Sequence, residues 1–500
     1  MSKNVLKAGA ILSYILIIVD TLYGLLFVPF LISSLGNSEY GVYRIIASFT
    51  NSLAILDFGI GGTMLRFTAK YRAEKDKDSI NNFSAMGMIQ AFAFFILIAT
   101  ASFFMYQLLD PLYNDSLSAV ELAKAKKLFY FTSITIAITP FERVLFGILS
   151  GFEEFKFTKG LQIMILVLKM LLLIPLLLKF GDAIVLVGMN LLAVIASILI
   201  QFVFLRYKCG VRIKLKKWDN KVFKSSVGYT TLSFIQSIAV QFNSNLDNIV
   251  IGAVIGATAV AVYSIGLQLY NMFEHLAMAF SDLMLPTVSR QIAQGADNSL
   301  LEDTVIKVGR LEFIVLGGAL SGFAIIGKEF VFLWLGETYL WAWDVAIILM
   351  IPTMIPLIQN VCLSILRARN KMKFRTIAVC IMAFFNLAIT IIGVKLYGPL
   401  AASFGTALGL ICANIIAMNY YYYRVLHLNV FRIFREILTK TWICCLLASF
   451  ILLISNNFIG GTWINWIIKV VIFLVCYSIF LLLFGLNEDE KRVIMGRLRR

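Results

Sequence analysis

Long apolar runs, separated by short polar segments, follow one another along almost the whole chain. A helix of about 20 apolar residues is long enough to cross the hydrocarbon core of a bilayer. The strict alternation over about ten residues that is typical of membrane β-barrels is not seen. The pattern therefore predicts an all-α integral membrane protein with 14 transmembrane helices, at 8–34, 41–66, 82–109, 127–150, 158–179, 183–206, 226–254, 258–287, 307–327, 341–366, 374–396, 399–423, 433–456 and 462–485.

The chain carries an internal repeat at a shift of about 220 residues. The segment LGNSEYGVY at 35–43 is matched by IGATAVAVY at 255–263, and the Ile-Leu and Lys-Phe pairs of 148–157 recur in 365–374. Duplicated membrane units are typical of transporters that bind substrate between the repeats. We predict a first six-helix bundle, a basic cytoplasmic link, a second, pseudo-symmetric six-helix bundle and a region of two extra helices with a basic tail, at 1–210, 211–225, 226–425 and 426–500.

Composition and charge agree with a membrane protein. The 500 residues are 60% hydrophobic and 14% charged, which is more apolar surface than a soluble core can absorb. The net charge of +16 does not indicate nucleic acid, because the cations are concentrated in alternate loops. Since positive loops face the cytoplasm, we predict that both termini are cytoplasmic and that the protein spans the cytoplasmic membrane. The opposite loops hold only six cations: Lys124, Lys126, Lys127, Lys179, Lys328 and Lys395.

Motifs of enzymes and metalloproteins are missing from the sequence. The 7 Cys and 2 His residues form neither a CxxC nor a Cys/His cluster, so we expect no metal site. There is no GxxxxGK[ST] phosphate-binding loop and no Ser/His/Asp arrangement. The outer loops are too short for a membrane-embedded glycosyltransferase or polymerase. We therefore expect neither catalysis nor a cofactor.

Three short segments carry a family resemblance: LGNSEYGVY at 35–43, LDFGIGGTMLRF at 56–67 and ILSGFEEFKFTKG at 148–160. They resemble the Wzx-type flippases of the multidrug/oligosaccharidyl-lipid/polysaccharide (MOP) superfamily. The resemblance implies that the chain flips an undecaprenyl-diphosphate-linked oligosaccharide, such as an O-antigen unit of lipopolysaccharide, to the outer leaflet by alternating access. It also implies contact with membrane lipids and cooperation with a polysaccharide polymerase and glycosyltransferases.

Two other transport functions stay open. A multidrug exporter coupled to a cation gradient usually has twelve helices and an anionic cavity. Lipid II flippases have fourteen helices, but their arginine-rich first helix is not seen here, where Asp20 lies instead. For any of the three, H⁺ or Na⁺ is the expected coupling ion.

Charged and amide side chains at mid-span are the candidates for substrate binding. A charge there costs about 2.5–3.5 kcal/mol on insertion scales, so it usually faces a partner or a wet cavity. Cations suit a diphosphate, at mid-span or at the cytoplasmic mouth, and amides suit sugar hydroxyls. The alternatives are structural ion pairs, interhelical hydrogen bonds and solvated helix ends. The predicted substrate-binding residues are Arg143, Lys169, Arg66, Arg310, Asn243, Gln359 and Asn360.

Buried carboxylates are the candidates for charge balance or ion coupling. Glu142 is expected to pair with Lys169 of the next helix, and Asp247 shares a helix face with Asn243. The alternative for Glu142 is a structural ion pair between helices, and the alternative for Asp247 is interhelical hydrogen bonding. The predicted set is Glu142, Asp247, Glu274, Asp57 and Asp20.

Overall fold

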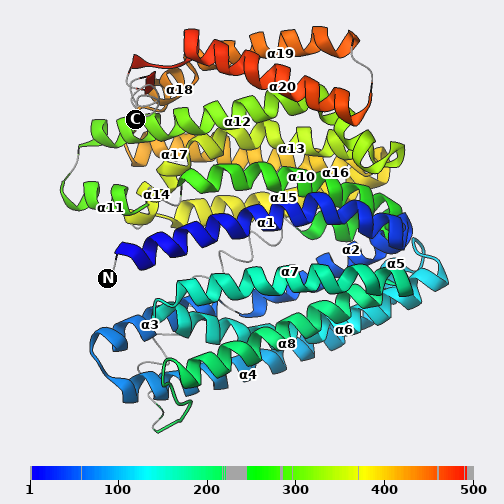
Figure 1. The fold of residues 1–500 in the computed structure, drawn as a ribbon, viewed down its shortest axis with the longest axis vertical. Coiled ribbons are helices and arrows are strands. Elements are labelled where there is room, and N and C mark those ends of the chain that lie inside the picture. Colours follow the sequence, from blue (N-terminus) through cyan, green and yellow to red (C-terminus); the bar gives the residue numbers. More distant parts are fainter. Residues whose placement is uncertain are drawn as a thin grey trace. The chain divides into compact units, whose positions relative to one another are not determined.

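The computed structural model describes residues 3–57, 59–216, 218, 220, 245–281, 285–295, 297–369, 371–458, 461–488 and 490–491. These residues form helices joined by turns, with no strand among them (Figure 1). Twelve of the helical stretches are long and apolar enough to span a membrane, and each coincides with one of the 14 predicted spans. The predicted span 226–254 lies largely outside the described residues, and helix α10 (Ala257–Ser281) covers most of the predicted span 258–287. The all-helical membrane fold is therefore confirmed.

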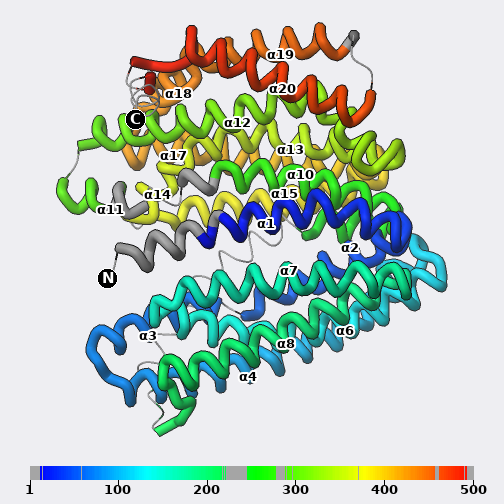
Figure 2. Tube along the Cα trace, viewed as in Figure 1, coloured from blue at the N-terminus to red at the C-terminus, as the bar shows by residue number. Residues whose placement is uncertain are grey.

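Residues Met1–Ala261 form the first of two compact units. Its long central helix α6 packs against α2, α3, α4 and α8, while α1 packs against α7. Figure 2 follows the path of this part of the chain. The helices of the unit are α1 (Lys3–Leu35), α2 (Asn37–Asn51), η1 (Ser52–Asp57), α3 (Ile60–Ala73), α4 (Lys77–Gln107), α5 (Leu109–Tyr113), α6 (Ala119–Gly151), α7 (Phe155–Phe180), α8 (Ala183–Tyr207) and the short helix Asn245–Val254.

Residues Val262–Arg500 form the second unit. Its longest helix, α12, packs against α13, α14, α18, α19 and α20. The elements that follow α10 are α11 (Leu285–Ala293), α12 (Asn298–Leu335), η2 (Glu337–Tyr339), α13 (Trp341–Ile358), α14 (Asn360–Ala368), α15 (Lys373–Tyr397), α16 (Leu400–Leu410), η3 (Ile411–Ala417), α17 (Met418–Val425), α18 (Val430–Leu438), α19 (Thr441–Phe458), α20 (Trp463–Phe480) and η4 (Leu481–Gly485). The predicted link 211–225 is only partly described, so the four-region division stays a prediction.

Two predicted spans are interrupted by breaks in the helix. The span 41–66 is built from α2, η1 and α3, and Gly59 before α3 has the left-handed backbone (φ 70°) that glycine adopts without strain. The span 341–366 is divided between α13 and α14, after Pro352 and Pro356 have removed two backbone donors. Hydropathy shows that these stretches are apolar, but it does not report such local changes of backbone direction. Polar side chains lie at both breaks.

Glycines allow backbones to meet at two places inside the first unit. Gly41 of LGNSEYGVY lies so close to Ala257 of IGATAVAVY that a Cβ atom on Gly41 would stand 2.0 Å from the Ala257 carbonyl oxygen. Between α3 and α6, a Cβ on Gly147 would lie 2.4 Å from the carbonyl oxygen of Gly61. Small residues permit this close helix packing in lipid, and they hold α3 and α6 together beside the site described next.

Candidate functional site

The break before α3 places Asp57 against Arg143 of α6. Asp57 Oδ2 lies 2.6 Å from Arg143 Nε, and the Gly59 N–H donates to Asp57 Oδ1 over 2.8 Å. That N–H is free to donate because the helix has not yet started at Gly59. Asp57 is buried, whereas 49% of the Arg143 side chain is exposed. The site thus holds a guanidinium by one edge and leaves the rest of it open.

Glu142 turns away from Arg143 and faces α8. The hydroxyl of Ser197 donates to Glu142 Oε1, and Gln201 Nε2 donates to the Ser197 hydroxyl over 2.7 Å. Ser197 and Gln201 are both buried. Neighbouring residues on a helix point in different directions, so α6 presents its acid to α8 and its base to the start of α3.

Lys169 of α7 is half-buried and also contacts α8. Its Nζ lies 3.3 Å from Asn190 Oδ1 and 5.3 Å from the centre of the Tyr23 ring of α1. The exposed Asp20, also on α1, is the carboxylate that acts on Lys169 electrostatically. The expected ion pair between Lys169 and Glu142 is not formed, because the two side chains reach α8 at Asn190 and Ser197.

The short helix Asn245–Val254 adds two buried polar residues to the first unit. Asp247 and Asn248 are each 2% exposed, and Asn248 Nδ2 donates to the hydroxyl of Ser48 on α2 over 2.9 Å. This is the interhelical hydrogen bonding that we considered as the alternative for this segment. Asn243 lies outside the described residues.

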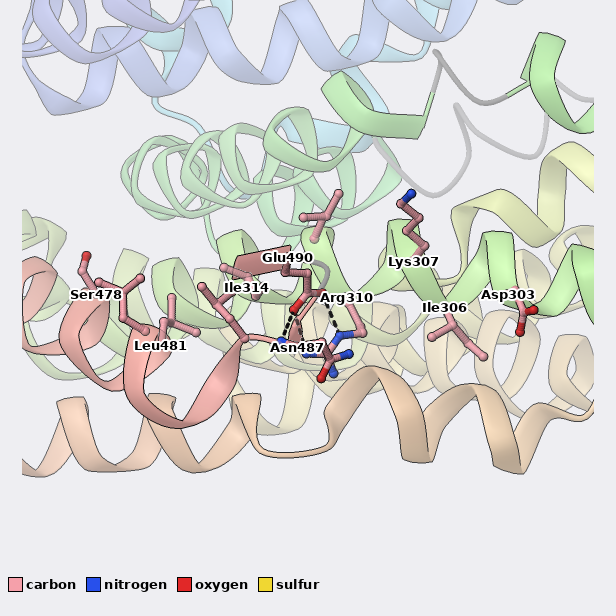
Figure 3. A pocket seen from close by; sticks show the side chains of 12 residues that line it. Asp303, Ile306, Lys307, Arg310, Ile314, Ser478, Leu481, Asn487 and Glu490 are labelled. Carbon is pink, nitrogen blue, oxygen red and sulfur yellow. Dashed lines mark hydrogen bonds and ion pairs between the residues drawn. The ribbon is translucent and has the colours of Figure 1, made fainter. Parts of the chain in front are cut away.

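Arg310 of α12 differs most from its expected place at the cytoplasmic mouth. It is 3% exposed, and its Nε lies 2.9 Å from Glu490 Oε1 (Figure 3). Nη2 donates to the carbonyl of Gly485 over 2.9 Å, and Nη1 donates to that of Glu436 over 2.8 Å. Every edge of the guanidinium is therefore occupied, and Arg310 joins α12 to α18 and to the segment after α20. Arg66 on α3, by contrast, is exposed as expected.

The pocket in Figure 3 lies beside Arg310 and has a volume of about 630 Å³. Leucine and isoleucine side chains of α12, η4 and the residue after η4 line half of it, and charged residues, among them Lys307, line part of the rest. A second crevice of about 490 Å³ continues between α12 and α20 from Leu481 to Trp466. Together they form an apolar groove on the second unit with charged residues at one end.

Three other predicted residues, Gln359, Asn360 and Glu274, lie in the second unit. Gln359, at the break between α13 and α14, is 1% exposed and donates to Asn419 Oδ1 over 2.8 Å. Asn360 begins α14 and is half-buried. Glu274 accepts a hydrogen bond from the hydroxyl of Tyr270, four residues earlier on α10. The Tyr270 hydroxyl in turn accepts one from Thr353 of α13 over 3.3 Å.

The sequence reasoning missed a charged cluster where α2, α6 and α8 begin. Lys124 Nζ lies 2.8 Å from Asp182 Oδ2 and 3.1 Å from Glu39 Oε1, which also accepts the Ala183 N–H. Burial alone would raise the pKa of Asp182, but hydrogen bonds from Lys124 and Ile184 lower it below its ordinary value. Glu39 is the glutamate of the LGNSEYGVY motif, so the motif could have pointed to one member of this charged cluster.

A buried ion pair in the second unit was also missed. Lys469 of α20 is 2% exposed, and its Nζ lies 2.7 Å from both Glu329 Oε2 of α12 and Asn456 Oδ1 of α19. The lysine lies in an apolar run of the sequence, but its charged partner Glu329 is 140 positions away. Across the described ranges, no three His, Cys, Asp or Glu side chains are placed to hold a metal ion.

Twelve apolar helices among the described residues define a multi-pass membrane protein, and several of them carry charged side chains within the span. The chain belongs to a family described as polysaccharide biosynthesis proteins, whose model matches residues 6–292. No curated protein matches it.

Solved structures share the fold at low sequence identity. The chain is similar to the lipid II flippase MurJ in an inward closed conformation, with 15% identity and a TM-score of 0.72, over 98% of this chain and 99% of that one. It is also similar to an inward-facing MATE multidrug resistance transporter of the MOP superfamily, with 15% identity and a TM-score of 0.68, over 82% and 94%. A MOP superfamily transporter from Pyrococcus furiosus, whose binding pocket is described as having reversed polarity, matches with 17% identity and a TM-score of 0.57, over 86% and 96%. These likenesses confirm the fold that the family resemblance implied.

Proposed function

We propose that the protein flips an undecaprenyl-diphosphate-linked oligosaccharide from the cytoplasmic to the outer leaflet of the cytoplasmic membrane. The observation that carries the proposal is Arg143, whose side chain lies within a span, is half-exposed, and pairs with Asp57 through Nε. A planar guanidinium suits a diphosphate, because it can donate two parallel hydrogen bonds to phosphate oxygens. The family, and the likeness to a lipid II flippase, support the same class of substrate.

Asp57 gives Arg143 a partner when no substrate is bound. A lone cation at mid-span would be costly, so the carboxylate neutralises it and fixes its direction. A diphosphate brings the negative charge with it and competes for the open edge of the guanidinium. Lys169 adds a second cation on the same unit, and its contacts with Asn190 and Tyr23 are weaker than an ion pair. Arg66 stays a proposed contact at the cytoplasmic mouth, whereas Arg310 is withdrawn because its donors are already used.

The proposed roles of the remaining residues follow their chemistry. Asn243, Gln359 and Asn360 would meet sugar hydroxyls. The carboxylates Glu142, Asp247, Glu274, Asp57 and Asp20 would balance charge or couple transport to H⁺ or Na⁺. A polymerase and glycosyltransferases would act on the same lipid-linked sugar on either side of the flipping step.

A cation-coupled drug exporter is the second candidate, because MATE transporters share the fold. Its substrates are cationic, so a half-exposed arginine at mid-span would repel them. The Asp57–Arg143 pair therefore favours an anionic substrate.

Binding of undecaprenyl diphosphate tests the proposal on the purified full chain. We expect Arg143→Ala to weaken this binding about tenfold or more, since a charge-assisted hydrogen bond contributes about 1.5–3 kcal/mol. Arg143→Lys should retain part of it, and Lys156→Ala, which removes an exposed cation of the same unit, should have no effect. Native mass spectrometry with undecaprenol as the uncharged control reads out the diphosphate contribution. Equal binding by Arg143→Ala and the unsubstituted protein would remove Arg143 from the site.

A further inference from the structure

The first unit has an apolar crevice of its own, where α4, α6 and α8 meet. It has a volume of about 580 Å³, and all the side chains that line it are apolar, among them Phe141 of α6 and Ile195, Leu199 and Phe202 of α8. Leu199 is 59% exposed and Phe202 is 46% exposed. In a protein that spans a membrane, an outward-facing apolar crevice of this kind is filled by lipid rather than by water.

A smaller polar hollow adjoins this crevice where α8 ends. Its volume is about 330 Å³, and it shares Phe202 and Ile213 with the apolar crevice. Three exposed cations line it: Arg206, Arg212 and Lys214. The two hollows together form an apolar slot whose open end carries positive charge.

Hydrogen bonds to α4 hold the segment that supplies these cations. The Arg212 N–H donates to Asn81 Oδ1 over 2.6 Å, and the Lys216 N–H donates to Asn82 Oδ1 over 2.8 Å. The side chain of Val211 is buried in the core beneath. Asp78 of α4 is paired with Lys216 of the same segment. The backbone is therefore fixed, while the charges of Arg206, Arg212 and Lys214 point to the hollow.

We propose that this slot binds an anionic phospholipid of the membrane, with the head-group phosphate on Arg206, Arg212 and Lys214 and an acyl chain in the crevice. Basic pockets between transmembrane helices on the cytoplasmic side are the typical binding places of acidic head groups. From Phe202 to Ile195 the slot extends about 10 Å along α8, which is enough for several methylene groups. The bound lipid would add to the contacts that already hold the segment 211–216, so the protein's stability would depend on the lipid composition of the membrane.

Lipid retention by the purified full chain tests this proposal. The protein is released from nanodiscs of equimolar phosphatidylglycerol and phosphatidylcholine, and the retained lipids are counted by native mass spectrometry. The unsubstituted protein should retain phosphatidylglycerol over phosphatidylcholine, and Arg206→Gln/Arg212→Gln/Lys214→Gln should lower that preference about tenfold. The matched control Arg367→Gln/Lys373→Gln/Arg435→Gln removes the same charge from exposed positions of the second unit and should keep the preference.

A second variant tests the acyl part of the slot. Leu199→Trp fills the crevice without altering charge, so it should lower retention of phosphatidylglycerol as the charge variant does. Full retention in both variants, or an equal loss in the matched control, would overturn the proposal. Preferential retention of undecaprenyl phosphate, added to the same nanodiscs, would overturn it as well, since the slot would then be a substrate site. None of these readouts depends on transport, so their failure leaves the proposed function standing.

Discussion

At the scale of single residues, four charged side chains of the described spans each have a side-chain partner. Arg143 has Asp57, Glu142 has Ser197, Lys169 has Asn190, and Lys469 has Glu329. Lys469 is 2% exposed in its pair with Glu329, whereas the Arg143 side chain is 49% exposed. That difference in exposure separates a structural charge from one that can receive a ligand.

The buried Lys469 pair makes a prediction about stability. Lys469→Met should destabilise the second unit by about 3–5 kcal/mol, because Glu329 would stay buried without a counter-charge. Lys469→Met/Glu329→Gln should be milder, since it removes both charges. Thermal unfolding in detergent measures both, with the exposed Lys395→Met as the control. A single variant as stable as the double variant would show that the pair is not the reason for the buried lysine.

The sequence identified most of these residues but not their partners. Arg143, Lys169 and Lys469 stand out because charges are rare in apolar runs. Asp57 is 86 positions from Arg143, and the break at Gly59 that aims it cannot be read from hydropathy. Arg310 was misplaced for the same reason, because Glu490 is 180 positions away.

At the scale of elements, ion pairs and hydrogen bonds of charged side chains connect the ends of helices. Hydropathy predicts where these helices lie in the sequence but not which of their ends are in contact. Lys124 joins the starts of α2, α6 and α8, and Arg310 joins α12, α18 and the segment after α20. Apolar length predicted the spans well, because the bilayer fixes how long a helix must be. The breaks at Gly59 and Gln359 were not predicted, because they depend on backbone conformation and not on hydrophobicity.

The Arg310–Glu490 contact makes a prediction about pH. Burial raises the pKa of Glu490, but the guanidinium of Arg310 and the N–H of Asn487 together lower it by more. The pKa of Glu490 is therefore below the ordinary value. A lowered pKa stabilises the folded contact above the ordinary glutamate pKa of about 4.3, and this contribution is lost as the pH falls through the folded value. Hydrogen exchange at Gly485–Glu488 should therefore rise in acid, and Glu490→Gln should show the faster exchange already at pH 7. Unchanged exchange in the variant would contradict a role for the ion pair.

At the scale of the whole molecule, the apolar chain forms two compact units, and the half-exposed Arg143 lies in the first unit. The family model covers 6–292, which includes most of the first unit and the start of the second, and it does not name the sugar. Orientation in the membrane follows from loop charge and stays a prediction. The central claim is that Arg143, oriented by Asp57, receives the diphosphate of a lipid-linked sugar during flipping.

Flipping by the reconstituted full chain tests that claim most directly. Proteoliposomes carrying a fluorescent undecaprenyl-diphosphate oligosaccharide are quenched from outside, and the protected fraction is followed in time. We expect Arg143→Ala and Asp57→Asn to slow flipping at least tenfold at equal protein content, with Arg143→Lys in between and Lys156→Ala unchanged. Flipping by Arg143→Ala at the unsubstituted rate would contradict the account.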